Sequence, residues 1–384
     1  MKLHMTCDEA IEPRCRHFKI CGGCRFQHIP YDEQLIQKRQ FVSDCFGRSV
    51  EKVLPCDPHW HYRNKMEFSF SQAKSGEKFL GLMRSRGKVE NLSECYLAQT
   101  WVLDVLSSVR EWWLDTPLMA YHPHSNKGYL RTLTFREGVH TGEKMAILTV
   151  SDEPCEEQYL RNLTDILSHL NSVILRKQII QKKVPTRFEE RILSGKDHIH
   201  ELLHDAEGRS FHFRIKAASF FQPNTYQAET IYQQAVALAD LKKQDEVLDL
   251  YCGTGSLGIF ASPHVSHVTG IEIVPEAVED AHANIHLNQI TNLQVFAGDV
   301  GKVLSNLSHC PTTVFVDPPR VGLGPTAISH LLNLQPETIV YVSCNPASQA
   351  QDCAQLGYNI LHLQPIDQFP HTPHVENIAL LKKR

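Results

Sequence analysis

Two polar residues near the C-terminus of this 384-residue sequence could carry covalent chemistry. Cys344 follows an apolar run, and the Asn345-Pro346 step directs the chain out of a strand into a turn. A cysteine within such a run usually packs as a small apolar residue. Cys344 stands after the run, so we expect its thiol to face a crevice at the strand end. Glu376, if it already lies on the last strand, shares a face with His374 and presents a carboxylate.

A glycine-rich turn directly follows the apolar run Val247–Leu250. Gly253, Gly255 and Gly258 match G-x-G-x-x-G, in which the absent side chains let the backbone and a helix N-terminus approach a ligand. Glu272 closes the next expected strand, where a carboxylate can accept hydrogen bonds from both hydroxyls of a ribose. The turn and the acid together predict a cofactor that contains adenosine.

Two further acidic residues help to separate NAD from S-adenosylmethionine, which both fit this turn. Asp299 closes the third expected strand, where it could bond the exocyclic amine of adenine. Asp317 opens the peptide Asp-Pro-Pro-Arg320 after the fourth strand. A dehydrogenase has no general need for this peptide, whereas it resembles the motif IV loop of class I methyltransferases. We therefore expect S-adenosylmethionine.

Three of the 12 cysteines, Cys15, Cys21 and Cys24, lie close together near the N-terminus, where their thiolates could converge in a tight loop. A redox C-x-x-C pair here lacks the strand and helix of thioredoxin-like proteins. Structural zinc is the stronger rival, although the spacing is atypical of zinc knuckles and the fourth ligand would be remote or a histidine, His17 or His28. Iron–sulfur clusters commonly take a remote cysteine, for which Cys95 is the candidate.

These residues need a scaffold, and from about residue 211 the sequence alternates apolar runs with stretches of helical spacing. This pattern predicts a doubly wound, mostly parallel sheet, with strands expected at 247–250, 267–271, 293–296, 313–316 and 338–342. Upstream, the pattern predicts an α+β region, with strands near 66–70 and 146–150 and a helix near 160–170. The expected division is a cysteine-rich lobe at 1–56, a central domain at 57–210 and a C-terminal domain at 211–384.

Composition limits the classes of partner. With 39 basic and 43 acidic residues the formal net charge is −4, so nucleic acid would bind local basic patches, such as the Lys- and Arg-rich segment 61–88. No run approaches the roughly 18 apolar residues of a membrane span, and the N-terminus lacks the apolar region of a signal peptide. We therefore expect a cytoplasmic protein without a membrane partner, whose cysteines are not in disulfides.

Together, these peptides resemble the RNA uracil-C5 (5-methyluridine) methyltransferase family. The resemblance covers the C-terminal half in the family's order: Ser-Phe-Phe-Gln-Pro-Asn around Gln222, Asp-Leu-Tyr-Cys-Gly-Thr-Gly, Asp-Pro-Pro-Arg, Ser-Cys-Asn-Pro and Phe-Pro-His-Thr-Pro-His-Val-Glu. It implies that Cys344 is the nucleophile and Glu376 the base. Ser256 departs from the asparagine common at its place. The cofactor is implied to lie among Gln222, Tyr251, Ser256, Glu272, Asp299 and Asp317.

The implied reaction explains why a thiol is needed. Uracil C5 is a weak nucleophile, so a thiolate first adds to C6 and turns C5 into an enolate carbon that takes the methyl group. A base then removes the remaining proton from C5, and elimination frees the enzyme. The target base must leave its stack, which favours a loop or bulge of the RNA.

The N-terminal cysteines also match part of this family. Members that bind a four-iron, four-sulfur cluster have a similar triple and a distant fourth cysteine, so the resemblance implies a structural 4Fe-4S cluster on Cys15, Cys21, Cys24 and Cys95. The chain leaves no room for the N-terminal β-barrel called TRAM that many members carry. A cluster without this barrel is most like the shorter bacterial 23S rRNA enzymes.

The expected protein is therefore α/β, with a doubly wound class I (Rossmann-like) methyltransferase domain, an α+β central RNA-binding domain and a small iron–sulfur lobe. The expected substrate is 23S rRNA, with transfer RNA as the alternative and no obligate protein partner. An adenine or guanine amino-group methyltransferase, which needs no thiol, is a second possibility for Asp-Pro-Pro-Arg. A cluster-bearing RNA-binding module with a vestigial site is disfavoured, because the cofactor acids, the thiol and the base are all present.

Overall fold

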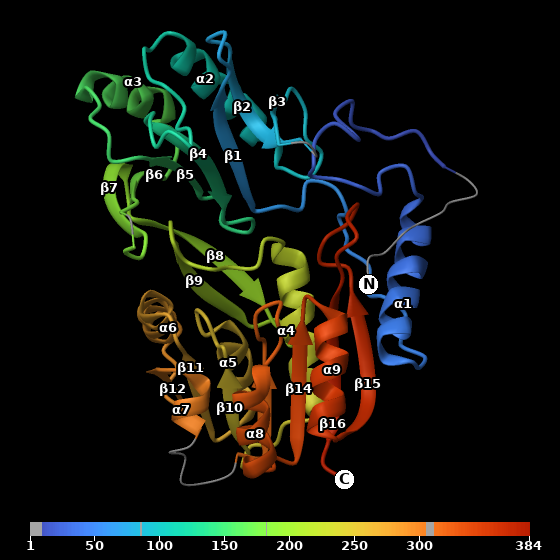
Figure 1. Ribbon diagram of the computed structural model, residues 1–384. Coiled ribbons are helices and arrows are strands. Elements are labelled where there is room, and N and C mark those ends of the chain that lie inside the picture. Colours follow the sequence, from blue (N-terminus) through green and yellow to red (C-terminus); the bar gives the residue numbers. More distant parts are fainter. Residues whose placement is uncertain (1–9, 85–86, 182, 305–310) are drawn as a thin grey trace.

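The computed structural model describes residues 10–84, 87–181, 183–304 and 311–384. It has a seven-stranded sheet at each end and a two-stranded sheet between them (Figure 1). Residues 1–9 of the expected N-terminal lobe, and Arg86 of the expected basic segment, lie outside the described residues. The domain boundaries at 56 and 210 stay predictions.

The sheet of the middle region has the order β3-β2-β1-β4-β5-β6-β7 and is antiparallel except where β5 pairs with β6. In β1, buried Met66, Phe68 and Phe70 alternate with more exposed polar residues, so one face packs under α2 and α3. The strands expected near 66–70 and 146–150 and the helix expected near 160–170 are present as β1, β5 and α3. The bounds in this region are β1 (Lys65–Gln72), β2 (Lys78–Met83), β3 (Val89–Asn91), α2 (Thr100–Leu114), β4 (Leu130–Glu137), β5 (Lys144–Val150), α3 (Glu157–Leu167), β6 (Ser172–Ile179) and β7 (Arg187–Gly195).

The C-terminal sheet has the order β12-β11-β10-β13-β14-β16-β15. The first five strands are parallel, and β16 is antiparallel to both of its neighbours. All five strands expected from the apolar runs are present. The bounds are β10 (Glu246–Leu250), β11 (His267–Glu272), β12 (Leu293–Ala297), β13 (Thr313–Val316), β14 (Thr338–Ser343), β15 (Asn359–Ile366) and β16 (Glu376–Lys382).

Helices cover both faces of this sheet. Phe315 of β13 belongs to an apolar cluster with α4, α5 and α6, whereas its neighbours Val314 and Val316 pack with α8 and α9 on the other face. The sheet is therefore doubly wound, as expected. The helices are α4 (Thr225–Ala239), α5 (Ser256–Ala261), the short η1 (Ser262–His264), α6 (Pro275–Leu287), α7 (Val300–Leu304), α8 (Gly324–Leu334) and α9 (Pro346–Leu356).

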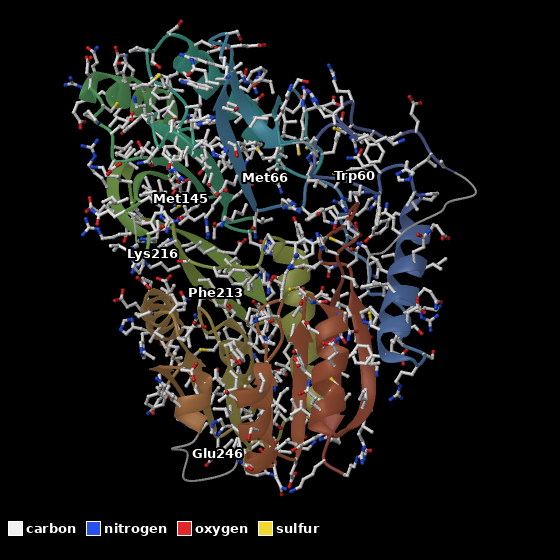
Figure 2. All side chains as sticks on the ribbon, in the orientation of Figure 1. Trp60, Met66, Met145, Phe213, Lys216 and Glu246 are labelled. Atoms are coloured by element: carbon white, nitrogen blue, oxygen red, sulfur yellow. The ribbon has the colours of Figure 1, made fainter. Side chains whose placement is uncertain are left out.

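Two elements join the halves of the molecule. The hairpin of β8 (His198–His204) and β9 (Ser210–Lys216) lies between the sheets. Phe213 of β9 and Met145 of β5 share one apolar cluster with α4 (Figure 2). Helix α1 (Tyr31–Phe46) lies beside α9 and β15 and contributes Val42 to the cluster of α8 and α9. Among the described residues, no helix is long and apolar enough to cross a membrane.

Candidate active site

Five parallel strands end at one edge of the C-terminal sheet, and the strand order reverses at β10. Because β10, β11, β13 and β14 are parallel, their carboxyl ends share this edge, and ligands of open α/β sheets bind there. The residues at or just after these ends are Tyr251, Glu272, Asp317 and Cys344. The fold thus brings four of the expected site residues to one edge.

The glycine-rich turn is held in place by two buried acids. Glu272 accepts hydrogen bonds from the backbone N–H groups of Gly253 (3.0 Å) and Val274 (2.8 Å), so its carboxylate lies against the turn. Asp249 accepts from the N–H of Gly258 at 2.9 Å and ties the start of α5 to β10. Tyr251 has a φ of 61°, in the left-handed region that few residues other than glycine adopt.

A cavity of about 150 Å³ opens beside this turn. Its walls combine apolar side chains, among them Ile273 and Leu323, with polar groups, and Asp299 supplies a carboxylate. A flat adenine fits such a slot, because its faces pack on apolar side chains while an acid accepts a hydrogen bond from its amine. The lining residues are Tyr251, Ile273, Asp299, Val300, Gly301, Leu323, Thr326 and Ala327.

The other two expected cofactor residues, Ser256 and Gln222, are not among the residues that line this cavity. Ser256 is buried at the start of α5, where it bonds the hydroxyl of Tyr232. Gln222 accepts a hydrogen bond from Nε2 of Gln368 at 3.0 Å. This contact joins the side chain of Gln222 to the segment that leads into β16, not to the glycine-rich turn.

The thiol of Cys344 lies among three charged groups. Burial, together with the negative charges of Glu376 and Asp317, raises the pKa of the Cys344 thiol to about 11. Arg320 opposes them, because its charge and a side-chain hydrogen bond to the thiol lower this pKa. The carbonyl of Arg320 also accepts from Nδ2 of Asn345 at 2.8 Å, which ties the loop after β13 to the loop after β14. A cation is thereby positioned to stabilise a thiolate.

Glu376 is the first residue of β16 and only 4% exposed. Burial, together with the charge of Asp317, raises the pKa of Glu376 well above its usual range, and Arg320 lowers it. Burial also raises the pKa of Asp317 to about 7. The site therefore combines a thiol, two buried carboxyl groups with raised pKa values and one cation. Groups of these types can add to an electrophilic carbon and then move a proton.

The expectation that His374 shares a strand face with Glu376 is wrong, because β16 begins only at Glu376. Pro373 lacks an N–H for the ladder, so the residues before Glu376 form a turn. Burial lowers the pKa of His374 to about 4, and the charge of Arg320 lowers it further, so this imidazole is neutral at pH 7.

Two residues that position the site, Arg320 and Lys38, were given no role by the sequence motifs. Arg320 stands within a motif already noted, which is a signal that could have identified it. Lys38 of α1 offers no such signal, because Nζ bonds Oδ1 of Asp367, 329 residues away, at 2.5 Å, with both side chains fully buried. Lys38 also donates to the carbonyl of Phe369 at 3.1 Å. Helix α1 thereby holds the segment that leads to Glu376.

The four cysteines expected to bind metal line one cavity of about 240 Å³ between the N-terminal segment and the central sheet. Burial, and the neighbouring thiols, raise the pKa of Cys15 to about 11 and of Cys24 to about 12. Among the described residues, no three of these sulfurs lie within 4.8 Å of one another. His17 also lines the cavity, but its ring nitrogens contact Ser93 (3.0 Å) and Glu90 (3.5 Å).

Comparisons with known proteins agree with this architecture. A model of the family described as tRNA (Uracil-5-)-methyltransferase matches residues 30–299 and 301–384. A protein of Protochlamydia amoebophila named as an RNA methyltransferase is 42% identical over 411 residues, which cover 99% of this chain and 93% of the relative. One of Chlamydia muridarum, also named as an RNA methyltransferase, is 37% identical and covers 97% and 99%, respectively.

A solved structure extends the match to three dimensions. The tRNA (uracil-54, C5)-methyltransferase of Pyrococcus abyssi, in complex with S-adenosyl-L-homocysteine, superposes with a TM-score of 0.76 at 28% identity, covering 94% of this chain and 86% of that one. The expected class I (Rossmann-like) methyltransferase fold is thereby confirmed. With its motifs at the expected strand ends and the family model matched over most of its length, the chain belongs to the tRNA (uracil-5-)-methyltransferase family.

Proposed function

We propose that this protein uses S-adenosylmethionine to methylate C5 of a uridine in RNA, through a covalent adduct on Cys344. The observation that carries the proposal is the meeting of Cys344, Arg320, Asp317 and Glu376 at the ends of β13, β14 and β16. An amino-group methyltransferase would need no thiol beside a buried base, and the matched family is named for uracil C5.

Each residue has a defined part in the reaction. Arg320 stabilises the thiolate of Cys344, which forms a bond to uracil C6 and leaves an enolate carbon at C5. S-adenosylmethionine, when bound, supplies an electrophilic methyl group to this carbon. Glu376, in its ionised form, then accepts the proton of C5, and its raised pKa makes this carboxylate a stronger base than an exposed one. The bond between sulfur and C6 breaks as the C5–C6 double bond returns.

We also propose that the cofactor lies among Gln222, Tyr251, Ser256, Glu272, Asp299 and Asp317. The slot beside Tyr251 and Asp299 supports an adenine there, and the position of Glu272 against the glycine-rich turn supports a ribose next to it. The three-part division at residues 56 and 210 belongs to the same proposal, with the central domain holding the RNA.

The proposed substrate is 23S rRNA, since the four converging cysteines support the likeness to the cluster-containing rRNA enzymes. Transfer RNA is a second candidate, because the 28%-identical Pyrococcus abyssi protein acts on uracil-54 of tRNA. Mass mapping of 23S rRNA and tRNA from cells with and without the gene distinguishes them. We expect one 5-methyluridine to disappear from 23S rRNA, and its disappearance from tRNA alone would transfer the assignment.

A covalent-trapping experiment tests the chemistry. RNA containing 5-fluorouracil should form a stable adduct with the wild-type protein, because the base cannot remove fluorine from C5. Cys344→Ala should bind S-adenosylmethionine but form neither adduct nor product, and Glu376→Gln should accumulate an adduct on ordinary RNA. Cys155→Ala, which removes a partly buried thiol of the central region, is the matched control. Full methylation by Cys344→Ala, or a methylated purine as product, would refute the mechanism.

We propose that Cys15, Cys21, Cys24 and Cys95 hold a 4Fe-4S cluster. A single zinc ion, with bonds of about 2.3 Å to sulfur, would need sulfurs about 3.8 Å apart. The wider spread of these sulfurs and the cavity of about 240 Å³ support a larger group. The cluster would tie the N-terminal segment to the central sheet.

Iron and acid-labile sulfide in anaerobically purified protein test this assignment. We expect about four iron and four sulfide ions per chain and a lower content of both in Cys95→Ser. Cys45→Ser is the control and should keep the full content, because Cys45 lies on α1 outside the cavity. A colourless protein with one zinc per chain would contradict the cluster.

A further inference from the structure

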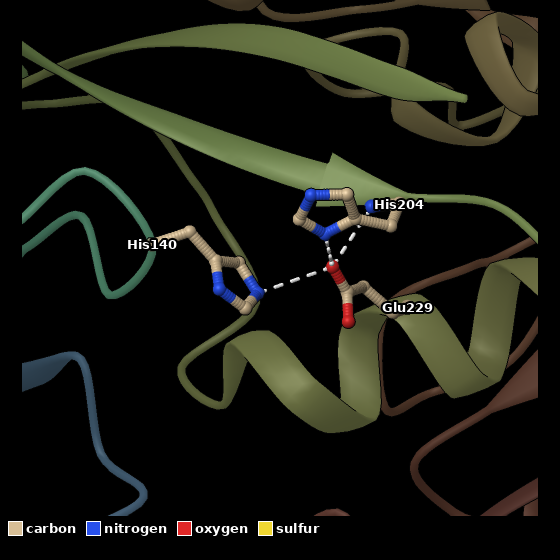
Figure 3. A group of neighbouring side chains, drawn as sticks. All are labelled: His140, His204 and Glu229. Carbon is tan, nitrogen blue, oxygen red and sulfur yellow. Dashed lines mark hydrogen bonds and ion pairs between the residues drawn. The ribbon is translucent and has the colours of Figure 1, made fainter. Parts of the chain in front are cut away.

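Three side chains that could hold a metal ion, His140, His204 and Glu229, lie close together (Figure 3). His140 comes from the turn between β4 and β5, His204 is the last residue of β8, and Glu229 lies on α4. One ligand atom from each residue lies within 4.8 Å of the other two. The active site and the cysteine cavity use none of these residues.

The distances within this group suit one small cation. Oε1 of Glu229 lies 2.8 Å from Nδ1 of His204 and 3.2 Å from Nε2 of His140. Ligands about 2.0–2.2 Å from a tetrahedral zinc ion are about 3.3–3.5 Å apart, so a small adjustment admits the ion. The two imidazole rings cross at 83°, and each directs a nitrogen toward the carboxylate (Figure 3).

The group is held in position by contacts that do not depend on an ion. Glu201, fully buried, accepts from the backbone N–H of His140 at 2.9 Å and from the hydroxyl of Thr225 at 2.7 Å. The turn that carries His140 is thus attached to the start of α4. The carbonyl of His204 accepts from Nε2 of Gln233, also on α4, at 2.8 Å. Such outer contacts orient ligands before a metal binds.

The donor set identifies the kind of ion. Two imidazoles and one carboxylate suit zinc, whereas magnesium and calcium take oxygen ligands. The contacts of the described residues engage only Oε1 of Glu229, so Oε2 can turn to an ion. The side chain of His140 is 25% exposed, and that of His204 is 39% exposed, so a cation can enter from solvent.

We propose that His140, His204 and Glu229 bind a zinc ion, with the fourth position open to water. The ion would join the β4–β5 turn of the central sheet to α4, the helix that begins just after Gln222. The site is structural, since it lies apart from the reacting groups. The inference does not depend on the proposed reaction or on the cluster.

Cobalt(II) serves as the probe, because its visible spectrum distinguishes nitrogen and oxygen ligands from thiolates. Full-length protein as purified, freed of loosely bound metal by a chelator, should take up one equivalent that zinc displaces. The difference spectrum against the protein without cobalt should lack a thiolate-to-cobalt charge-transfer band. His140→Ala and Glu229→Gln should each lower the affinity for cobalt at least 10- to 100-fold, since loss of a residue that only hydrogen-bonds to a metal ligand typically has an effect of this size. His200→Ala is the matched control, since this imidazole pairs with Glu143 at 3.2 Å outside the proposed triad.

Hydrogen exchange provides a second measurement. Added zinc should slow exchange of the amides at 138–143 in the wild-type protein and in His200→Ala, but not in Glu229→Gln. Circular dichroism of each variant without metal checks folding, and Glu229→Gln, nearly the same shape as the native residue, decides the matter if His140→Ala does not fold. Absence of saturable uptake, or undiminished affinity in Glu229→Gln, would overturn the proposal.

Discussion

Arg320 should control the reactivity of Cys344, because it is the cation that bonds the thiol. With a pKa of about 11, only about one thiol in a thousand is ionised at pH 8 in the free protein. A hydrogen bond to a charged group contributes about 1.5–3 kcal/mol, and one pKa unit corresponds to about 1.4 kcal/mol. Arg320→Gln should therefore raise the pKa of Cys344 by about 1–2 units and lower the thiolate fraction at pH 8 about 10- to 100-fold.

Alkylation by iodoacetamide measures this effect without any RNA. The rate at Cys344, followed by mass spectrometry of its peptide between pH 7 and 10, should rise about tenfold per pH unit in the wild-type protein. Arg320→Gln should shift the whole profile to higher pH, and Arg320→Lys, which keeps the charge, should shift it less. Cys155 is an internal control, because its charged neighbours are Glu157, Glu156 and Arg191.

The reasoning would be refuted by superimposable pH profiles for Cys344 in the wild-type protein and Arg320→Gln. It would also be refuted if the rate at Cys155 fell as much as the rate at Cys344, because a general change of structure would then account for both.

Two further predictions concern stability, measured by urea denaturation. Lys38→Met leaves Asp367 buried without its cation and should lower the free energy of unfolding by about 3–5 kcal/mol. Lys52→Met, at an exposed position, is the control. An equally small change in both variants would contradict this prediction. Burial raises the pKa of Asp249 to about 8, so the folded chain keeps a proton that the unfolded chain loses near pH 4, and stability should fall as pH rises from about 4 to 8. Asp249→Asn should lack this loss. Between pH 5 and 8 the free energy of unfolding should therefore fall by at least about 1.4 kcal/mol more in the wild-type protein than in Asp249→Asn, which is the equivalent of one pKa unit. Parallel pH profiles for the two proteins would contradict this.

The C-terminal half was the most predictable part of the fold. The strands expected at 313–316 and 338–342 correspond to β13 and β14. Parallel strands covered on both faces appear as short apolar runs, and their ends carry the polar residues of the site. The middle region was predicted only as α+β, because the pairing order of its antiparallel strands depends on contacts between distant segments.

Sequence alone determined the family resemblance and the residues at the strand ends, since each motif is local and the parallel sheet brings such ends together. Only the tertiary structure decided what surrounds them. The bond from Lys38 to Asp367, the contact of Arg320 with the thiol, and the group of His140, His204 and Glu229 join segments that no local pattern relates. These contacts depend on how separate elements pack, and packing is a property of the whole folded chain.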